Sequence, residues 1–296
     1  MAIPEDQLET WSHQGSITQS SDTYAPVKNA LEASDTKFAG KAFKVFLQGS
    51  YGNNTNIYAE SDVDVVIRLD EIYYFDVSKL NAQHLQNFNA SSVPGSYPYA
   101  DYKSHVVSAL EKSFTKADVT AGAKAIKIKA KGTRRTADVI AAAQFRDYYS
   151  TPLGPDFHAG ICFFDSSGTR IVNYPEQHRQ NCINKQASTN TWFKPTVRIF
   201  KNMRSKLVDD KIIQKGTAPS YFIEGLLYNV PDDKFGKTYE DTAVEAINWL
   251  LKADRTKLLC ANERYYLVRD SVHNCWPTAD CESFMSGIVK LWKDWK

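Results

Sequence analysis

The stretch VFLQGSYGNNTNIYAESDVDVVIRL (residues 45–69) constrains the fold more than any other part of the chain. It begins and ends as a buried strand, yet Asp62 and Asp64 stand at the start of its second apolar run. Side chains alternate between the two faces of a strand, so both aspartates point one way while Val63 and Val65 point the other. The sequence therefore predicts a sheet that holds two carboxylates side by side at one strand end.

Paired carboxylates of this kind suit a divalent cation. Mg²⁺ binds one or two carboxylates together with substrate phosphates and completes its octahedron with water. The alternative for a lone Asp-x-Asp is a solvent-facing strand end, because short motifs are weak evidence. Gly49 and Ser50 favour the metal site, since glycine lets the backbone approach a phosphate and serine offers that phosphate a hydroxyl and an amide.

A third carboxylate is expected from Asp138, in the segment RRTADVIAAAQF. It stands early in an otherwise apolar strand, where an isolated charge is costly unless it is paired or bound to a metal. Carboxylates arranged in this way can hold two ions about 3.5–4 Å apart, which activate an attacking hydroxyl and stabilise a leaving pyrophosphate. We therefore expect Asp138 to lie beside Asp62 and Asp64.

Composition sets the outer limits. A chain of 296 residues, 43% hydrophobic and 24% charged, can form one large or two modest globular domains. The net charge of +2 predicts no strong field for nucleic acid or membrane, so any basic site must be local. The first residues are not expected to be a secretory signal, and no apolar run approaches the roughly 20 residues that span a bilayer. Five cysteines fit reduced thiols. We expect a cytoplasmic monomer without a membrane segment.

The first half of the chain mixes helix and strand patterns, whereas the second half shows helical spacing of apolar residues. The expected elements of the first half are a helix at 23–33, strands at 43–49 and 63–69, a long surface loop at 87–102, a helix at 101–114, and hairpins at 124–145 and 160–174. We therefore expect a mixed α/β catalytic lobe at 1–175 with an N-terminal helix, and a helical lobe at 176–296 that closes over the site. Pockets favour domain interfaces, so an active site between the lobes is the natural expectation.

Two features of the second half could serve phosphate binding. A helix near Trp192 carries a polar, basic stripe, which consists of Lys194, Arg198, Lys201 and Ser205. Such a stripe could hold a triphosphate, and a solvated helix face is the alternative. The segment APSYFIEGLLYNV then begins a helix near Pro219, where Ser220 could be a cap and Tyr221 a core residue.

These motifs carry a family resemblance. LQGSYGNNTNIYAESDVDVVI resembles the signature of the nucleotidyltransferase superfamily that includes DNA polymerase β, in which Gly-Ser precedes two aspartates separated by one apolar residue. Asp138 stands where that superfamily has its third metal-binding aspartate. The basic helix followed by PSYFIEGLLYNVP resembles, more narrowly, the bacterial CD-NTases, the relatives of cyclic GMP–AMP synthase and DncV. ADVIAAAQFRDY and RIVNYPEQH are also similar to that family, so the likeness runs from Val45 to Val230.

The resemblance implies an α+β, bilobed polymerase β-like fold and the template-independent joining of nucleoside triphosphates (ATP and/or GTP, UTP, CTP) into a cyclic di- or trinucleotide. It further implies two Mg²⁺ (or Mn²⁺) ions and a role in bacterial anti-phage (CBASS) signalling, with an activating RNA or a regulatory protein as a form of control. The implied site has Asp62 and Asp64 holding both ions, Asp138 completing one of them, Gly49, Ser50, Lys201 and Ser220 binding the donor triphosphate, and Tyr221 stacking on a base.

Three other functions remain open on the sequence alone. A transferase that tails RNA or tRNA would use the same carboxylates but would want a larger basic surface. A transferase that modifies a small molecule or a partner protein is usually shorter than this chain. A non-catalytic binding module would be favoured by the loss of an aspartate, and all three are present.

Some residues are left with weaker interpretations. His273, Cys275 and Cys281 lack an evident fourth ligand for zinc. His178 is interpreted as structural, and Thr55 stays without an assigned role. The remaining candidates are a solvated or nucleotide-binding face of Lys127, Lys129 and Lys131, and the base-contacting candidates Asn173, Asn181 and Tyr221.

Overall fold

The computed structural model describes residues 2–15, 17–58, 62–272 and 274–295. Contacts within the chain divide it into two compact units. We call them the helical unit (Met1–Ile17, Gly49–Ser61 and Glu176–Lys296) and the sheet unit (Thr18–Gln48 and Asp62–Pro175). Residues 1–17 and 49–61 thus group with the C-terminal half of the chain. The assignment of 1–175 as a catalytic lobe and 176–296 as a closing lobe stays a prediction.

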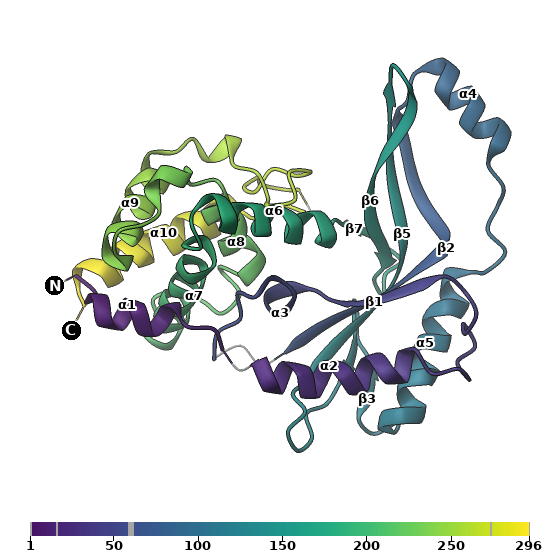
Figure 1. Ribbon diagram of the computed structural model, residues 1–296, viewed down its shortest axis with the longest axis horizontal. Coiled ribbons are helices and arrows are strands. Elements are labelled where there is room, and N and C mark those ends of the chain that lie inside the picture. Colours follow the sequence, from purple (N-terminus) through teal and green to yellow (C-terminus); the bar gives the residue numbers. More distant parts are fainter. Residues whose placement is uncertain (1, 16, 59–61, 273, 296) are drawn as a thin grey trace. The chain divides into compact units, whose positions relative to one another are not determined.

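The described part of the sheet unit contains one seven-stranded sheet. Its order is β1-β2-β5-β4-β3, and in addition β6 pairs with β5 and β7 pairs with β6 (Figure 1). The strands are β1 (Phe43–Leu47), β2 (Val63–Lys79), β3 (Val119–Ala121), β4 (Ile126–Ile128), β5 (Ala137–Thr151), β6 (Gly154–Phe164) and β7 (Arg170–Asn173). The helices are α2 (Ile17–Leu31, from its second residue on), α4 (Ala82–Ser91) and α5 (Tyr99–Phe114).

Strands β2 and β5 run parallel at the centre of this sheet. Side chains on both faces of early β2 are buried, which fits a central strand covered on both sides. Helix α5 is fixed to these strands by two hydrogen bonds, in which the Tyr102 hydroxyl donates to the Ile67 carbonyl (2.9 Å) and the Tyr99 hydroxyl donates to the Ala141 carbonyl (2.8 Å). The strand ends that carry the aspartates are therefore part of a well-packed sheet.

Beyond Leu69 the register between β2 and β5 shifts, and both strands continue with β6 as an extension of the sheet (Figure 1). Aromatic contacts join α4 to this extension, because Phe88 packs against Phe75 (ring centroids 4.8 Å apart) and Tyr148 (5.1 Å). The sequence predicts a strand at 63–69 only. The extension is missed because its side chains are mixed aromatic and polar and only partly buried.

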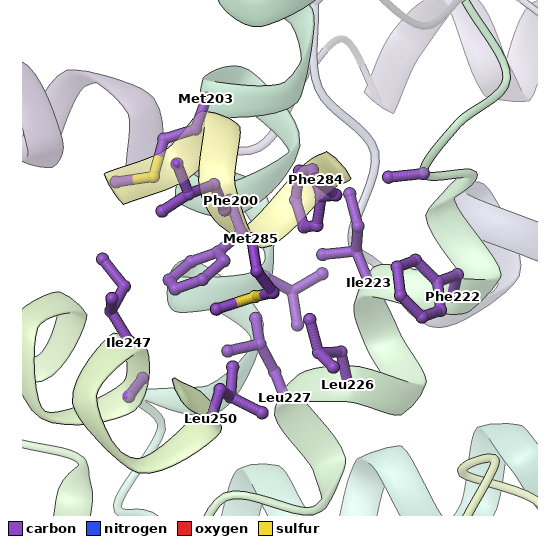
Figure 2. Packing of buried hydrophobic residues seen from close by; sticks show 14 of the residues in the cluster. Phe200, Met203, Phe222, Ile223, Leu226, Leu227, Ile247, Leu250, Phe284 and Met285 are labelled. Carbon is purple, nitrogen blue, oxygen red and sulfur yellow. The ribbon is translucent and has the colours of Figure 1, made fainter. Parts of the chain in front are cut away.

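The helical unit is built around one apolar core. Its helices are α1 (Glu5–Ser12), α3 (Gly49–Asn53), α6 (Pro175–Ser188, which joins the unit from its second residue), α7 (Phe193–Asp209), α8 (Ser220–Tyr228), α9 (Tyr239–Lys252) and α10 (Thr278–Lys293), with 3₁₀ turns η1 (Asp232–Lys234) and η2 (Arg255–Lys257). Figure 2 shows side chains of α7 to α10 meeting in this core, among them Phe200, Phe222, Leu250 and Met285. Helix α1 joins it through the fully buried Leu8, and Glu5 caps α9 by accepting the amide hydrogens of Tyr239 and Glu240 at 2.7 Å each.

The predicted α+β class is confirmed, as are the helix at 101–114 and both hairpins. The long loop expected at 87–102 is wrong, since α4 ends at Ser91 and α5 begins at Tyr99. Helix α4 has no buried residue, so the apolar periodicity that reveals a helix is weak there; Asn81 nevertheless caps it by accepting the His84 amide hydrogen at 2.9 Å. None of the described helices combines the length and apolar character that crossing a membrane requires.

Candidate active site

The sheet unit brings the three predicted aspartates together. Asp62 directly precedes β2, Asp64 is its second residue, and Asp138 is the second residue of β5. Asp64 and Asp138 are register partners in the parallel pair, so their side chains project from the same face of the sheet. Asp62 is close enough for its charge to raise the pKa of Asp138. Three carboxylates from two neighbouring strands therefore converge at one end of the sheet.

The surroundings of Asp138 suit an oxygen-ligated cation. Its Oδ1 atom is buried, and no described residue donates a hydrogen bond to it. Burial raises the pKa of Asp138, an effect that Lys127 opposes and Asp62 reinforces. The Lys127 Nζ atom lies 3.9 Å from Oδ1, and its side chain is half exposed. A buried carboxylate oxygen that lacks a donor, beside two further carboxylates, fits the ligand set of Mg²⁺ or Mn²⁺.

The Gly-Ser pair opens a short helix of the helical unit. Gly49 has φ = +63°, a left-handed conformation that glycine adopts without strain, and it starts α3. The chain then folds back on itself, because the Thr55 amide donates to the Ser50 carbonyl (2.9 Å). Tyr51, Thr55 and most neighbouring residues up to Ile57 are buried. We refer to residues 49–57 as the Gly-Ser loop.

Lys201 of α7 meets this loop. Its Nζ atom donates to the Ser50 Oγ atom (2.8 Å) and to the Thr55 carbonyl (3.0 Å), and the Lys201 side chain is fully buried. The structure thus brings Ser50 and Lys201 together across 151 residues of sequence. The alternative of a solvated basic stripe is wrong for α7, because Lys201 is fully buried, Arg198 donates to the Asn54 carbonyl (2.8 Å), and burial lowers the pKa of Lys194.

Ser220 and Tyr221 begin α8. The cap position belongs to Pro219, so the alternative that Ser220 is the cap residue is wrong. The Tyr221 ring stacks on His178 (centroids 4.5 Å apart) and, at 5.9 Å, on Trp276. Burial raises the pKa of Tyr221 well above its ordinary value. The residue as a whole is partly buried.

Sequence reasoning missed Glu224, a buried side chain with several polar partners in the helical unit. It lies on α8 and is 1% exposed. Its carboxylate accepts hydrogen bonds from Asn53 Nδ2 (2.8 Å), His178 Nε2 (2.7 Å) and the Thr55 hydroxyl, and it lies 3.5 Å from Lys201 Nζ. A single charge in the apolar run FIEGLLY was the available signal. The buried His178 agrees with its interpretation as structural.

Burial alone raises the pKa of Glu224, but the Lys201 ammonium and the hydrogen bonds from His178 and Thr55 outweigh it and hold the pKa at about 2. The ligand atoms of His178, Cys182 and Glu224 lie within 4.8 Å of one another, a spacing that a metal could use. The carboxylate already accepts three hydrogen bonds beside an ammonium, so these residues form a poor cation site. Of the sequence-based cysteine–histidine candidate, His273 lies outside the described residues.

The other weaker candidates have partners inside their own unit. The Asn181 Nδ2 atom donates to the Ala261 carbonyl (2.8 Å), and Asn173 pairs with Ile161 in the sheet. Lys129 donates to the Ala117 carbonyl (2.9 Å). Thr55 is fully buried, and its hydroxyl donates to the Glu224 carboxylate.

Comparisons with known proteins place the whole chain. Residues 180–293 match the family model of the cGAS/DncV-like nucleotidyltransferase C-terminal helical domain. The chain is 38% identical to the cyclic UMP-AMP synthase of Rhodothermus marinus over 297 residues, covering 100% of this chain and 99% of the relative. It is 34% identical to the cyclic nucleotide synthase CdnE01 of Staphylococcus haemolyticus over 303 residues, covering 100% of both.

Solved structures agree. The structure of the Rhodothermus marinus CdnE c-UMP-AMP synthase with Apcpp and Upnpp superposes with a TM-score of 0.88 at 37% identity, covering 99% of this chain and 97% of that one. The Elizabethkingia meningoseptica CdnE cyclic dinucleotide synthase gives a TM-score of 0.76 at 29% identity, covering 98% of each chain. The three aspartates, the Gly-Ser loop and the full-length likeness thus have one explanation: this chain belongs to the cGAS/DncV-like nucleotidyltransferases, the CD-NTases.

Proposed function

We propose that this nucleotidyltransferase joins nucleoside triphosphates, without a template, into a cyclic di- or trinucleotide. The observation that carries the proposal is the register pairing of Asp64 with Asp138, beside Asp62, in a chain that matches cyclic nucleotide synthases along its whole length. RNA tailing and modification of a partner protein are less well supported, since the relatives described above are named for cyclic products.

The proposed roles follow from position. Asp62 and Asp64 would hold both Mg²⁺ (or Mn²⁺) ions, and Asp138 would complete the site of the ion that activates the acceptor hydroxyl. When bound, such ions lower the pKa of the acceptor hydroxyl and stabilise the leaving pyrophosphate. Asp138 is suited to this role by a buried oxygen that accepts no hydrogen bond from the part of the chain that the structure describes.

We assign the donor triphosphate to Gly49, Ser50, Lys201 and Ser220. Gly49 and Ser50 present backbone and hydroxyl at the start of α3, and Lys201 supplies the positive charge next to the Ser50 hydroxyl. Ser220 is the first residue of α8, where amide groups point outward from the helix. Tyr221 is assigned to stacking on a base.

The choice of nucleobases does not follow from the likeness to these relatives. Relatives between 30% and 38% identical are named for cyclic UMP-AMP, dipurine, dipyrimidine and GMP-AMP products. Likeness at this level therefore does not choose among ATP, GTP, UTP and CTP for this chain. Anti-phage (CBASS) signalling, an activating RNA or regulatory protein, a cytoplasmic location and a monomeric state stay predictions from the sequence.

The test is incubation of the purified protein with the four labelled nucleoside triphosphates and Mg²⁺. We expect a small product that resists phosphatase, and omission of one nucleotide at a time identifies its bases. A product that forms only when RNA is added would replace the proposal with RNA tailing. No product with any nucleotide, with Mg²⁺ or Mn²⁺, would count against catalysis by the chain alone.

A further inference from the structure

The Glu224 carboxylate has donors on both oxygens. Oε1 faces the Thr55 hydroxyl and the Lys201 ammonium, and Oε2 faces Asn53 Nδ2 and His178 Nε2. Two of these donors belong to the Gly-Ser loop, one to α6 and one to α7. Glu224 is therefore the group at which three separate segments of the helical unit are joined.

Lys201 links the Glu224 carboxylate to the Ser50 hydroxyl. Its ammonium has three N–H groups, and its partners are Ser50 Oγ (2.8 Å), the Thr55 carbonyl (3.0 Å), Thr55 Oγ1 (3.2 Å) and the more distant Glu224 (3.5 Å). The side chain is buried, so the directions of these contacts are fixed by the protein. The orientation of the Ser50 hydroxyl thus depends on Lys201, and that of Lys201 depends on the Glu224–Thr55 contact.

We propose that Glu224 is a positioning residue for the transfer reaction, which sets the Ser50 hydroxyl and the Lys201 ammonium in the geometry that receives the donor triphosphate. This inference rests on the proposed function. Glu224 acts only through Lys201 and the Gly-Ser loop and does not itself touch the nucleotide.

Glutamine can replace the hydrogen bonds of the Glu224 carboxylate but not its charge. An amide has one accepting oxygen, and its NH₂ group must face one of the two pairs of donors. Asn53 and His178 can present an acceptor after a flip or a tautomer change, but an ammonium cannot. In Glu224→Gln the amide oxygen therefore stays towards Lys201, as Oε1 does in the wild type, and the buried ammonium loses its counter-charge.

The experiment measures kcat and KM for the nucleoside triphosphates in Glu224→Gln, about 20 °C below the melting temperature of the variant, and the Kd of non-hydrolysable analogues of all four nucleotides. We expect KM and Kd to rise and kcat/KM to fall about tenfold to a hundredfold. The matched control is Asp147→Asn, which removes the charge of a buried carboxylate that pairs with the exposed Lys79 (2.6 Å). Asp147 lies nine residues beyond Asp138 along β5, so this variant should lose stability with KM within twofold of the wild type.

A second pair of variants makes the test independent of whether Glu224→Gln folds. Thr55→Val removes the hydroxyl at Glu224 and should raise KM about fivefold, whereas Thr55→Ser keeps it and should stay within twofold. The control Thr242→Val removes a hydroxyl that is also buried and that bonds, among the described residues, to the Gly236 backbone (2.9 and 3.0 Å). It should lower the melting temperature without changing KM.

Unchanged KM and Kd in folded Glu224→Gln and Thr55→Val would overturn the inference. Equal changes in Asp147→Asn and Thr242→Val would also overturn it, because the effect would then follow stability alone. If the wild type forms no product, the proposed function fails, while the Kd values still decide the positioning role of Glu224.

Discussion

Asp138 and Glu224 each lie near a lysine, and their surroundings differ. Asp138 in the sheet unit has an exposed lysine 3.9 Å away and, on its buried oxygen, no hydrogen-bond donor among the described residues. Glu224 in the helical unit has a buried lysine 3.5 Å away and three hydrogen-bond donors. Burial raises the pKa of both, but only at Glu224 do the partners reverse that effect.

The difference fits two separate roles, cation binding for Asp138 and the positioning of neighbouring groups for Glu224. A carboxylate that is left short of donors keeps its oxygen available for a cation, and it is destabilised until the cation arrives. A carboxylate with every oxygen satisfied stays ionised and holds its neighbours in place. The sheet unit thus carries the chemistry of the proposed reaction, and the Glu224 network carries part of the geometry. The following predictions test this contrast.

The largest effect is expected at the metal-type carboxylates. The double change Asp62→Asn with Asp64→Asn removes two of three charges from the proposed ion site, so we expect product formation to fall by at least about 10³-fold. Radiolabelled product after phosphatase treatment is the measurement, and chelation of divalent ions should act equally strongly. Asp156→Asn, which changes an exposed carboxylate on β6, is the control. Activity in the double variant would remove these aspartates from the mechanism.

For the free energy of unfolding, the larger loss is expected in the Glu224 network and the smaller one at Asp138. Lys201→Met leaves the buried Glu224 charge without its ion-pair partner, and we expect a loss of about 3–5 kcal/mol in the free energy of unfolding. Lys127→Met removes a half-exposed partner of Asp138, where solvent screens the pair, so the loss should stay below about 1 kcal/mol. Urea unfolding of both variants gives the comparison. Similar losses in the two variants would mean that the Lys201–Glu224 pair contributes no more to stability than the Lys127–Asp138 pair.

The contrast also shows what the sequence could and could not predict. Asp62, Asp64 and Asp138 were found because strand alternation and an isolated charge in an apolar strand both constrain side-chain placement locally. Their adjacency follows from the parallel register of β2 and β5, which the structure supplies. The metal-binding role itself stays a prediction.

Glu224 could not be placed from the sequence, although its charge stands out in FIEGLLY. Its partners Asn53 and Thr55 are separated from it by 171 and 169 residues, and no local pattern links such distant positions. For the same reason the basic stripe on α7 was open to a solvated interpretation. Helical spacing shows which residues share a face, but only the fold shows what packs against that face.

The Glu224 network should make the free energy of unfolding depend on pH under acidic conditions. Because its folded pKa of about 2 is below the ordinary 4.5, Glu224 stabilises the fold above about pH 4.5, and this contribution is lost as the pH falls towards 2. We expect the stability difference between the wild type and Glu224→Gln to shrink over that range by on the order of 3 kcal/mol. Urea midpoints at several pH values test it. A constant difference would mean that Glu224 is not ionised in the folded state.

The smallest effect is expected for the Mg²⁺ requirement of Lys127→Met. This variant tests most directly whether Asp138 differs from Glu224 in its dependence on a lysine. The Lys127 ammonium lies on the same face of the sheet as Asp138, because the two residues are register partners in β4 and β5. It therefore competes with a divalent cation for the Oδ1 atom, by an amount that solvent limits to about 1 kcal/mol. Lys127→Met should lower the Mg²⁺ concentration for half-maximal rate about twofold to fivefold, measured at constant ionic strength. A higher Mg²⁺ requirement would instead show that Lys127 assists the bound substrate, and Asp138 would then resemble Glu224 in depending on its lysine.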